Sequence, residues 1–176
     1  MPSSNLSVLV GKSFVCIKIA GRANFASSPD FKTLLCELAE KKYSHFIIDL
    51  TDCVLMDSTF LGVLAGFGMR QNPQGAPARQ GIELHNATVR VKELLENLGT
   101  EHLFKATTGP LQLPADIVKT CTPEASTPTH EQLTRTSLEA HQTLMSINPE
   151  NVARFKDVAQ FLAEDLKSLD ACGGAE

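Results

Sequence analysis

The sequence predicts an α/β fold in which helices pack on a mixed β-sheet, followed by a helical hairpin near the C-terminal end. Between residues 6 and 108, short β-rich runs alternate with helical patterns in the order ββαβαβαβ, which is typical of a layered α/β domain. After a proline-rich stretch, two more helical patterns are joined only by Ser146-Ile147-Asn148, which favours antiparallel neighbours. We therefore divide the 176 residues into a domain at 1–117, a linker at 118–128 and a helical hairpin at 129–172.

The domain opens with two β-rich runs, at residues 6–10 and 13–20, that are separated by Gly11-Lys12. This spacing predicts a β-hairpin, because glycine tolerates the backbone conformation of a tight turn. In the second run the aliphatic residues Val15, Ile17 and Ile19 alternate with a mixed set, Phe14, Cys16 and Lys18. One face of this strand should therefore be more fully buried than the other.

The first helix is predicted from Pro29, which suits the first helical turn. Ser28 is a candidate N-cap, and Asp30 suits the positive end of the helix dipole. Apolar residues then recur with helical spacing, which predicts an amphipathic helix. They are Phe31, Leu34, Leu35 and Leu38.

Three strands and two helices complete the predicted domain. The apolar run at residues 45–50 predicts a central strand that is covered on both faces. A largely apolar helix begins at Ser58, and its small residues allow close approach to a sheet. A third helix is predicted at residues 89–98, with short strands at 82–85 and from Leu103.

The charges are unevenly distributed. The chain has 16 basic and 20 acidic residues; residues 1–117 hold 11 of each, so the excess of 4 acidic residues lies within 118–176. Without a basic patch that could neutralise a phosphate backbone, nucleic acid is not an expected partner. No apolar run approaches about 18 residues, so we expect no membrane span. Residues 1–11 also lack the features of a signal peptide.

The sequence predicts no metal site, no cofactor and no catalytic residue. The five cysteines are odd in number and form no CxxC pair, which favours reduced thiols and a cytoplasmic location. Glycine-rich phosphate loops are absent. Asp49, Asp52 and Asp57 flank one loop, where a metal site is conceivable, but loop solubility and helix capping are the preferred explanation. We expect the histidines to lie at the surface or at strand edges; they are His45, His85, His102, His130 and His141.

The most informative stretch is the strand–loop–helix junction at residues 49–62, where Ser58 falls at the start of a helix. Ser58 or Asp57 can simply cap that helix. A solvent-facing hydroxyl at a helix N-terminus is also a good phosphate acceptor, because the helix dipole and free N–H groups stabilise the added dianion. These residues alone leave both interpretations open.

Residues 49–64 read DLTDCVLMDSTFLGVL. This string resembles the central motif of STAS domains, specifically of bacterial anti-anti-sigma factors, whose usual form is D-L-x(5)-M/I-D-S-S/T-G-L-G-x-L. Supporting pieces match in order: the turn at Gly21–Asn24, the helix from Pro29 and the helical segment 90–95. The resemblance covers roughly residues 6–108 and leaves out the C-terminal hairpin.

The resemblance implies an anti-sigma factor antagonist, a phosphorylation-controlled switch that regulates transcription and is not an enzyme. The unphosphorylated domain would bind an anti-sigma factor, typically a serine kinase of the histidine-kinase-like type. Phosphorylation of Ser58, with Thr59 as a competing acceptor, would break the complex, and a PP2C-type phosphatase would reverse it. The implied partner-binding residues are Asn24, Asp57, Ser58, Thr59 and Phe60.

Two positions depart from the family pattern. Phe60 replaces the small glycine that follows the serine pair, and its ring could either reshape the partner surface or tuck under the helix. Asn24 stands where the family often has an acidic residue, which removes one negative charge near the acceptor.

Alternatives remain for both parts of the chain. The domain could instead sense a nucleotide or another small molecule, or serve as a signalling scaffold without phosphorylation. The two apolar stripes of the hairpin cannot stay unburied in water, since an isolated hairpin of this size is marginal. We expect the hairpin to pack on its own chain, with a homodimer or a second partner as the alternative.

Overall fold

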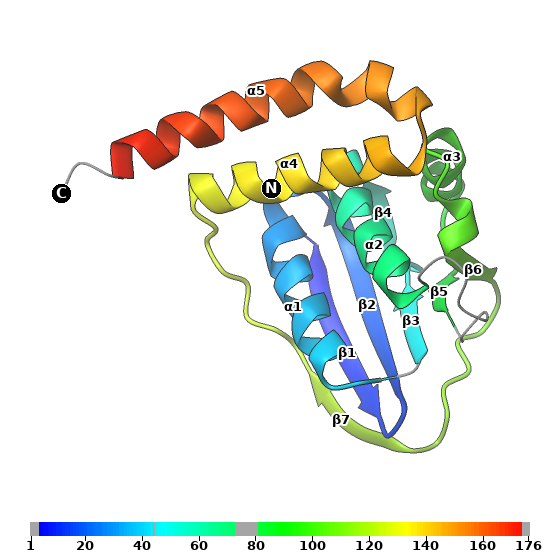
Figure 1. Ribbon diagram of the computed structural model, residues 1–176. Coiled ribbons are helices and arrows are strands. Elements are labelled where there is room, and N and C mark those ends of the chain that lie inside the picture. Colours follow the sequence, from blue (N-terminus) through cyan, green and yellow to red (C-terminus); the bar gives the residue numbers. More distant parts are fainter. Residues whose placement is uncertain (1–3, 44, 73–80, 174–176) are drawn as a thin grey trace.

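The computed structural model describes residues 4–43, 45–72 and 81–173. It shows a mixed sheet with helices packed on it, as the sequence predicts (Figure 1). The strands are β1 (Asn5–Gly11), β2 (Phe14–Ala23), β3 (His45–Asp49), β4 (Cys53–Met56), β5 (Ile82–His85), β6 (Phe104–Thr107) and β7 (Ile117–Cys121). The helices are α1 (Ser28–Glu40), α2 (Ser58–Gln71), α3 (Val89–Asn97), α4 (His130–Ile147) and α5 (Glu150–Gly173), with short 3-10 turns η1 (Phe25–Ser27) and η2 (Glu101–Leu103).

The sheet has the strand order β6-β5-β3-β2-β1-β7, and β4 pairs separately with the end of β2. β1 and β2 form the predicted antiparallel hairpin, whereas β2, β3, β5 and β6 run parallel to one another. β2 and β4 are parallel, so their carboxyl ends lie at the same edge of the sheet. The loops that follow these two strands therefore lie close together. This topology places the turn at Asn24 beside the start of α2.

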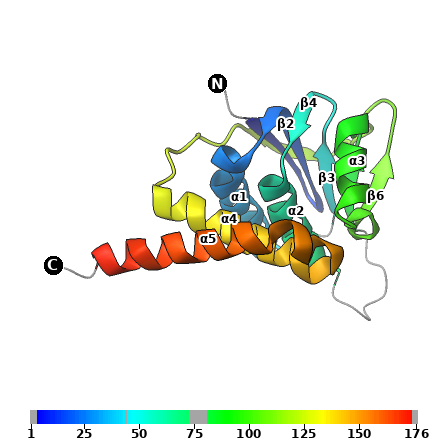
Figure 2. The ribbon, with the colours of Figure 1, turned by 90° about the horizontal axis from the view of Figure 1, so that it is seen from above.

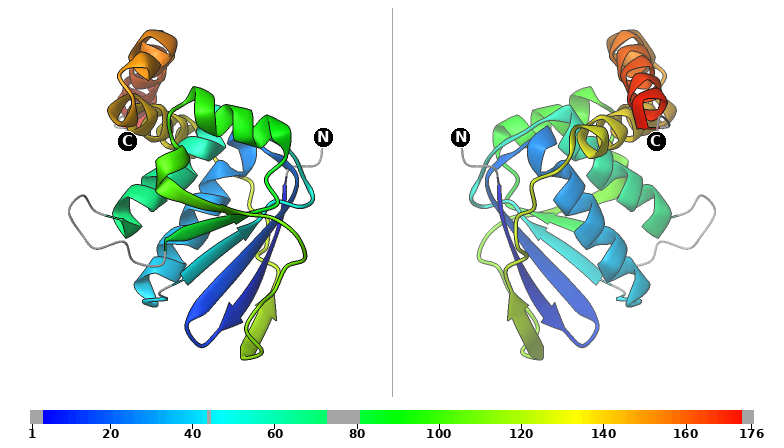
Figure 3. Two further views of the ribbon diagram at one scale, coloured as in Figure 1. Left: turned by 90° about the vertical axis from the view of Figure 1, so that its right-hand side faces the viewer. Right: turned by 90° about the vertical axis from the view of Figure 1, so that its left-hand side faces the viewer.

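The layers follow one another from the sheet outward. α1 and α2 cover one face of the sheet, α4 crosses near the N-terminal ends of both helices, and α5 lies on the outer side of α4 (Figures 1 and 2). Figure 3 shows the α4–α5 hairpin at one end of the domain and β7 at the edge of the sheet. No helix in the described parts of the chain is both long and apolar enough to cross a membrane.

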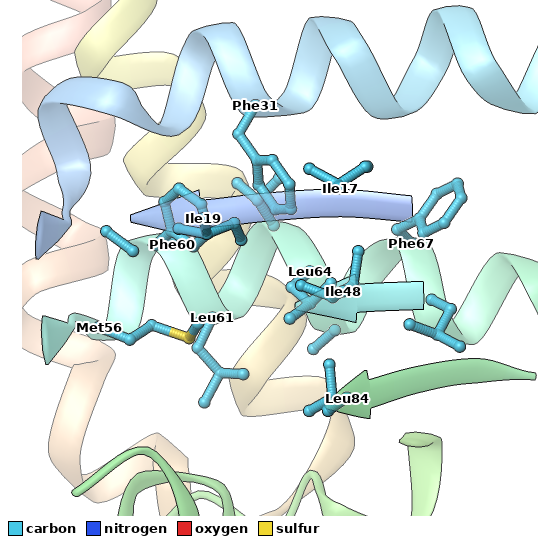
Figure 4. Close-up of a cluster of buried hydrophobic side chains, with 14 of the residues drawn as sticks. Ile17, Ile19, Phe31, Ile48, Met56, Phe60, Leu61, Leu64, Phe67 and Leu84 are labelled. Atoms are coloured by element: carbon cyan, nitrogen blue, oxygen red, sulfur yellow. The ribbon is translucent and has the colours of Figure 1, made fainter. Parts of the chain in front are cut away.

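The alternation in β2 divides the buried residues between two faces, as predicted. Ile17 and Ile19 join the main core beneath α1 and α2, together with Phe31 and Phe60 (Figure 4). The rings of Phe31 and Phe60 stack with centroids 4.3 Å apart. On the other face, Cys16 lies in a smaller cluster with Phe14 and Ile47, against which the irregular segment carrying Leu111 and Leu113 packs.

β7 corrects the boundary between the domain and the linker. It begins at Ile117 and runs through the first residues of the predicted linker, pairing antiparallel with β1 at Val8 and Cys121. Its side chains are mostly exposed, with Val118 67% exposed, so no buried apolar pattern marks the strand in the sequence. The strand instead adds backbone hydrogen bonds to an otherwise open edge, which also leaves 122–129 as the irregular connection to α4.

Two smaller differences concern local structure. The strand β4 was not predicted, because four residues with exposed Val54 and Leu55 show no strand periodicity. Helix α1 begins at Ser28 itself, so its N-cap is Ser27 and Pro29 occupies the second helical position. Both differences leave the order of the predicted elements unchanged.

The burial of Cys16 has a consequence for pH dependence. Burial, assisted by the nearby charge of Asp49, raises the pKa of this thiol from 9.0 to about 12. Above about pH 9 the unfolded chain therefore ionises Cys16 while the folded chain does not, so this group lowers stability as pH rises toward 12. Cys16→Ala should flatten the fall in the unfolding free energy between about pH 9 and pH 11, by up to about 1.4 kcal/mol per pH unit.

The measurement is urea unfolding at several pH values in that range. Cys172→Ala removes an exposed cysteine and is the matched control, which should keep the slope of the unmodified chain. Equal slopes for the two variants would show that the fold does not hold Cys16 protonated.

Candidate functional site

The candidate site is built around the carboxylate of Asp57, the N-cap of α2. One oxygen, Oδ1, accepts a hydrogen bond from the backbone N–H of Phe60 at 2.8 Å, inside the first turn of α2. The other, Oδ2, accepts from the N–H of Phe25 in η1 at 2.7 Å. The backbone N–H of Asp57 in turn donates to the carbonyl of Ala23 at 3.0 Å. A single residue therefore joins the end of β2 to the start of α2.

The surroundings of Asp57 act on its charge in opposite directions. Burial raises the pKa of the carboxyl above its ordinary value, while the N–H groups of Phe60 and Phe25 favour the ionised form. The net direction is upward, because burial is the largest effect. Ionised Asp57 is thus held by directed backbone donors rather than by bulk water.

Ser58 is the first residue of α2, and its half-buried side chain contacts the C-terminal hairpin. Its Oγ lies 3.2 Å from Nε2 of His141 in α4. The other ring nitrogen, Nδ1, lies 2.7 Å from the carbonyl oxygen of Ser137. A carbonyl only accepts, so Nδ1 carries the proton of the neutral ring, and Nε2 is left to accept from the Ser58 hydroxyl.

The contact with His141 corrects the prediction that the histidines lie at the surface or at strand edges. His141 is only 6% exposed, and its ring also packs on the ring of Phe155 in α5 with centroids 4.9 Å apart. The two partners are 83 residues apart in the chain, and His141 lies outside the part that resembles a known motif. No sequence pattern could have paired them.

The structure places the turn at Asn24 beside Asp57 and Ser58, because Asp57 is hydrogen-bonded to the residues on both sides of Asn24, Ala23 and Phe25. The carbonyl of Asn24 accepts hydrogen bonds from the hydroxyls of Ser27 and Ser28, each at 3.0 Å, which fixes the turn that presents the Phe25 N–H to Asp57. Asn24 therefore helps to shape the site through its backbone.

Thr59 and Phe60 lie elsewhere than expected for partner-binding residues. Thr59 is 5% exposed and Phe60 has no exposed surface, because its ring tucks under α2 and stacks on Phe31. Their side chains thus belong to the core, and Ser58 is the more accessible hydroxyl of the pair. The bulky residue at position 60 replaces the family's glycine without projecting from the surface.

Sequence reasoning missed three exposed apolar side chains near Asp57. Phe25 is 52% exposed, and Val54 and Leu55 in β4 are 61% and 39% exposed. Phe25 donates its backbone N–H to Asp57, and β4 leads directly into that residue. Val54 and Leu55 are consecutive apolar residues just before the motif, and this was the available hint. Consecutive strand residues point to opposite sides, and only one side of an edge strand faces the core, so at least one of the two had to be exposed.

Asp49, at the end of β3, stabilises the turn that follows that strand. Asp49 is buried, and its Oδ1 accepts hydrogen bonds from both the N–H and the hydroxyl of Thr51, at 3.1 and 2.6 Å. Lys18 lies 3.9 Å from its other oxygen. Within the described residues, no group of three or more His, Cys, Asp or Glu side chains is arranged to hold a metal ion.

Comparison with known proteins gives a family match. The family model of the STAS domain matches residues 5–111. Among solved structures, an anti-sigma factor antagonist from Mycobacterium paratuberculosis aligns at 13% identity over 56% of this chain and 80% of that one, with a TM-score of 0.47. The anti-sigma factor antagonist SpoIIAA in its unphosphorylated form aligns at 18% identity over 56% and 84%, also with a TM-score of 0.47. No curated protein matches the sequence.

Because the Asp57 carboxylate accepts hydrogen bonds from two elements, replacing it should lower stability more than replacing an ordinary helix cap. Asp57→Ala should lower the free energy of unfolding by about 2 kcal/mol, since two backbone donors in two elements lose their acceptor. Thr88→Ala is the control, because the Thr88 hydroxyl caps α3 through one N–H, that of Val91 at 3.4 Å. It should cost about 1 kcal/mol or less.

Urea unfolding of the two variants and of Asp57→Asn checks this prediction. Asparagine keeps a single side-chain acceptor, so Asp57→Asn should fall between the unmodified chain and Asp57→Ala. Equal losses for Asp57→Ala and Thr88→Ala would contradict the linking role of Asp57.

Proposed function

Since the chain belongs to the STAS domain family, we propose that it is an anti-sigma factor antagonist, a protein-binding switch that regulates transcription and is not an enzyme. With Ser58 unphosphorylated, the domain binds an anti-sigma factor that is also a serine kinase of the histidine-kinase-like type. Phosphorylation of Ser58 ends the complex, and a PP2C-type phosphatase restores it. The observation that carries this proposal is the position of the Ser58 hydroxyl in the first turn of α2.

The start of α2 suits a reversible phosphate. The first N–H groups of a helix and its dipole favour negative charge, so a phosphoserine there need not unfold the helix. Asp57 caps α2 from the neighbouring position and keeps the helix start in place independently of the Ser58 side chain. Modification can therefore change the surface while the fold persists.

The surface beside Asp57 suits a protein partner. Phe25 in η1 and Val54 and Leu55 in β4 expose large apolar side chains on the elements that flank Asp57. Consecutive strand residues point to opposite sides, so a partner at the start of α2 would cover Phe25 together with one side of β4. In such contacts apolar residues supply binding free energy and polar residues supply specificity.

The covalent step is an ordinary phosphoryl transfer. Ser58 Oγ would attack the γ-phosphorus of ATP held by the kinase, the bond to ADP would break, and the hydroxyl proton would pass to a base or to solvent. The phosphatase would hydrolyse the ester with water and release inorganic phosphate. Residues 1–117 carry equal numbers of basic and acidic residues, so one phosphate would change their net charge from zero to about −2.

The new charge would act against the partner directly. It would stand beside the carboxylate of Asp57 on the same contact surface, so an acidic patch of the partner would be repelled. The phosphate oxygens would also occupy space that a close contact requires. Both effects weaken the complex without a change in the fold of the domain.

Substitutions at Ser58 test this proposal. Ser58→Asp should weaken binding of the partner at least about tenfold by charge repulsion, while Ser58→Ala should keep it. Thr59→Ala is a matched control at a buried hydroxyl and should bind like the unmodified chain. The partner is first captured from a lysate of the native cell, and its affinity is then measured by calorimetry.

Intact-mass measurement supplies the second half of the test. Protein isolated from its native cell should carry a species heavier by about 80 Da that disappears on phosphatase treatment and is absent from Ser58→Ala. Equal affinity of the Asp and Ala variants, or a phosphate that survives in Ser58→Ala, would refute the assignment of Ser58.

A further inference from the structure

α4 lies on the start of α2 and contacts the half-buried side chain of Ser58, which the proposed function requires. His141 contacts Ser58 from one side, and Phe155 of α5 packs on its ring. Ser58 is therefore in contact with its own C-terminal hairpin, a part of the chain that lies beyond the matched family region.

The two helices meet at a crossing of small residues. A Cβ placed on Gly62 of α2 would lie 2.6 Å from the carbonyl oxygen of Ala140 and 2.7 Å from its Cβ, so only glycine permits this approach. One turn further along α2, a Cβ on Gly66 would lie 3.6 Å from the Thr143 methyl group, an ordinary van der Waals contact. The contact between α4 and Ser58 therefore requires that residue 62 has no side chain.

The contact made by α4 is suited to release. Of the six buried residues of α4, four are polar (Thr134, Thr136, Ser137 and His141), and burying polar residues yields less hydrophobic stabilisation than an aliphatic face would. Thr134 is turned to α5, where its hydroxyl donates to Asp165, so the other three bear on the inner side of α4. A cavity of about 300 Å³ also remains at this contact, lined by residues from α1, α2 and α4 that include Arg70, Glu139 and Thr143. Incomplete packing forfeits dispersion energy at the same contact.

The hinge between α4 and α5 is held by hydrogen bonds to the end of α3. The Asn151 amide donates to the carbonyls of Leu98 and Leu144, at 2.9 and 2.8 Å, and Arg154 donates to the carbonyl of Asn97 at 2.9 Å. Leu144 is fully buried. These bonds attach the hinge between α4 and α5 to the end of α3, and His141 lies less than one turn before Leu144, so α4 must pivot about this hinge as a whole to free Ser58.

We propose that the α4–α5 hairpin is an intramolecular occupant of the Ser58 surface, and that it must lift from α2 before a kinase or a partner protein can reach Ser58. The inference rests on the proposed function, for which it supplies a regulatory step. Phosphoryl transfer requires an unhindered Ser58 Oγ, and His141 Nε2 lies 3.2 Å from that oxygen. Docking of α4 and modification of Ser58 therefore exclude each other.

A thiol probe measures the lifting without any partner. Ser58→Cys places a thiol at the helix start, and mass spectrometry after digestion gives the rate of its alkylation by iodoacetamide separately from the native cysteines. Adding Gly62→Ala should accelerate labelling of position 58 about tenfold over the matched Gly66→Ala, because only the first substitution clashes with α4. Both gain similar helix propensity.

Cys16 is the internal control for folding, since it is fully buried and should stay unlabelled in both variants. Fast labelling of position 58 with slow labelling of Cys16 supports local release of the hairpin. Equal labelling rates at position 58 in the Gly62→Ala and Gly66→Ala proteins would overturn the inference, whether or not Ser58 is a phosphorylation site.

A second pair of variants leaves α2 unchanged. Ala140→Leu adds bulk at the crossing from the α4 side, and Ala153→Leu makes the same change at an exposed position of α5. In protein isolated from the native cell, the fraction phosphorylated at Ser58 should be at least about twofold higher for Ala140→Leu. Equal phosphorylated fractions would refute the regulatory step, whereas no phosphate in any variant would refute the proposed function and leave the labelling result standing.

Discussion

The two hydrogen bonds accepted by the Asp57 carboxylate are the constraint on which the site depends. They hold the N–H of Phe25 and the N–H of Phe60 against one side chain, and so fix the end of β2 relative to the start of α2. The exposed Val54 and Leu55 lie on the strand that leads into this residue. The turn at Phe25 and the start of α2 are thus positioned by a single half-buried carboxylate.

The start of α2 has two uses that compete for the same atoms. The Ser58 hydroxyl lies where a phosphate is electrostatically favoured, and the same hydroxyl donates to His141 in the docked hairpin. Gly62 permits the second use by letting Ala140 approach the helix. The acidic excess of the chain lies in the segment that contains this hairpin, so a phosphate at Ser58 would add charge close to an already acidic element.

The sequence predicted the parts of the structure that local patterns encode. The motif around Asp57 and Ser58 gave the start of α2, and alternation in β2 gave the buried face of the sheet. β7 escaped prediction because an edge strand with exposed side chains, such as Val118, is held by backbone hydrogen bonds that leave no apolar pattern. The pairing of Ser58 with His141 escaped for another reason, since a contact across 83 residues depends on how the hairpin packs.

If a docked α4 and a modified Ser58 exclude each other, phosphorylation must release α4 from α2. Hydrogen exchange followed by mass spectrometry measures this release, on protein that carries phosphoserine installed at position 58 during translation and on the unmodified chain. We expect faster exchange of the amides of α4 (His130–Ile147) in the phosphorylated protein, with unchanged exchange in β2 and β3. Identical protection of α4 in the two proteins would contradict it.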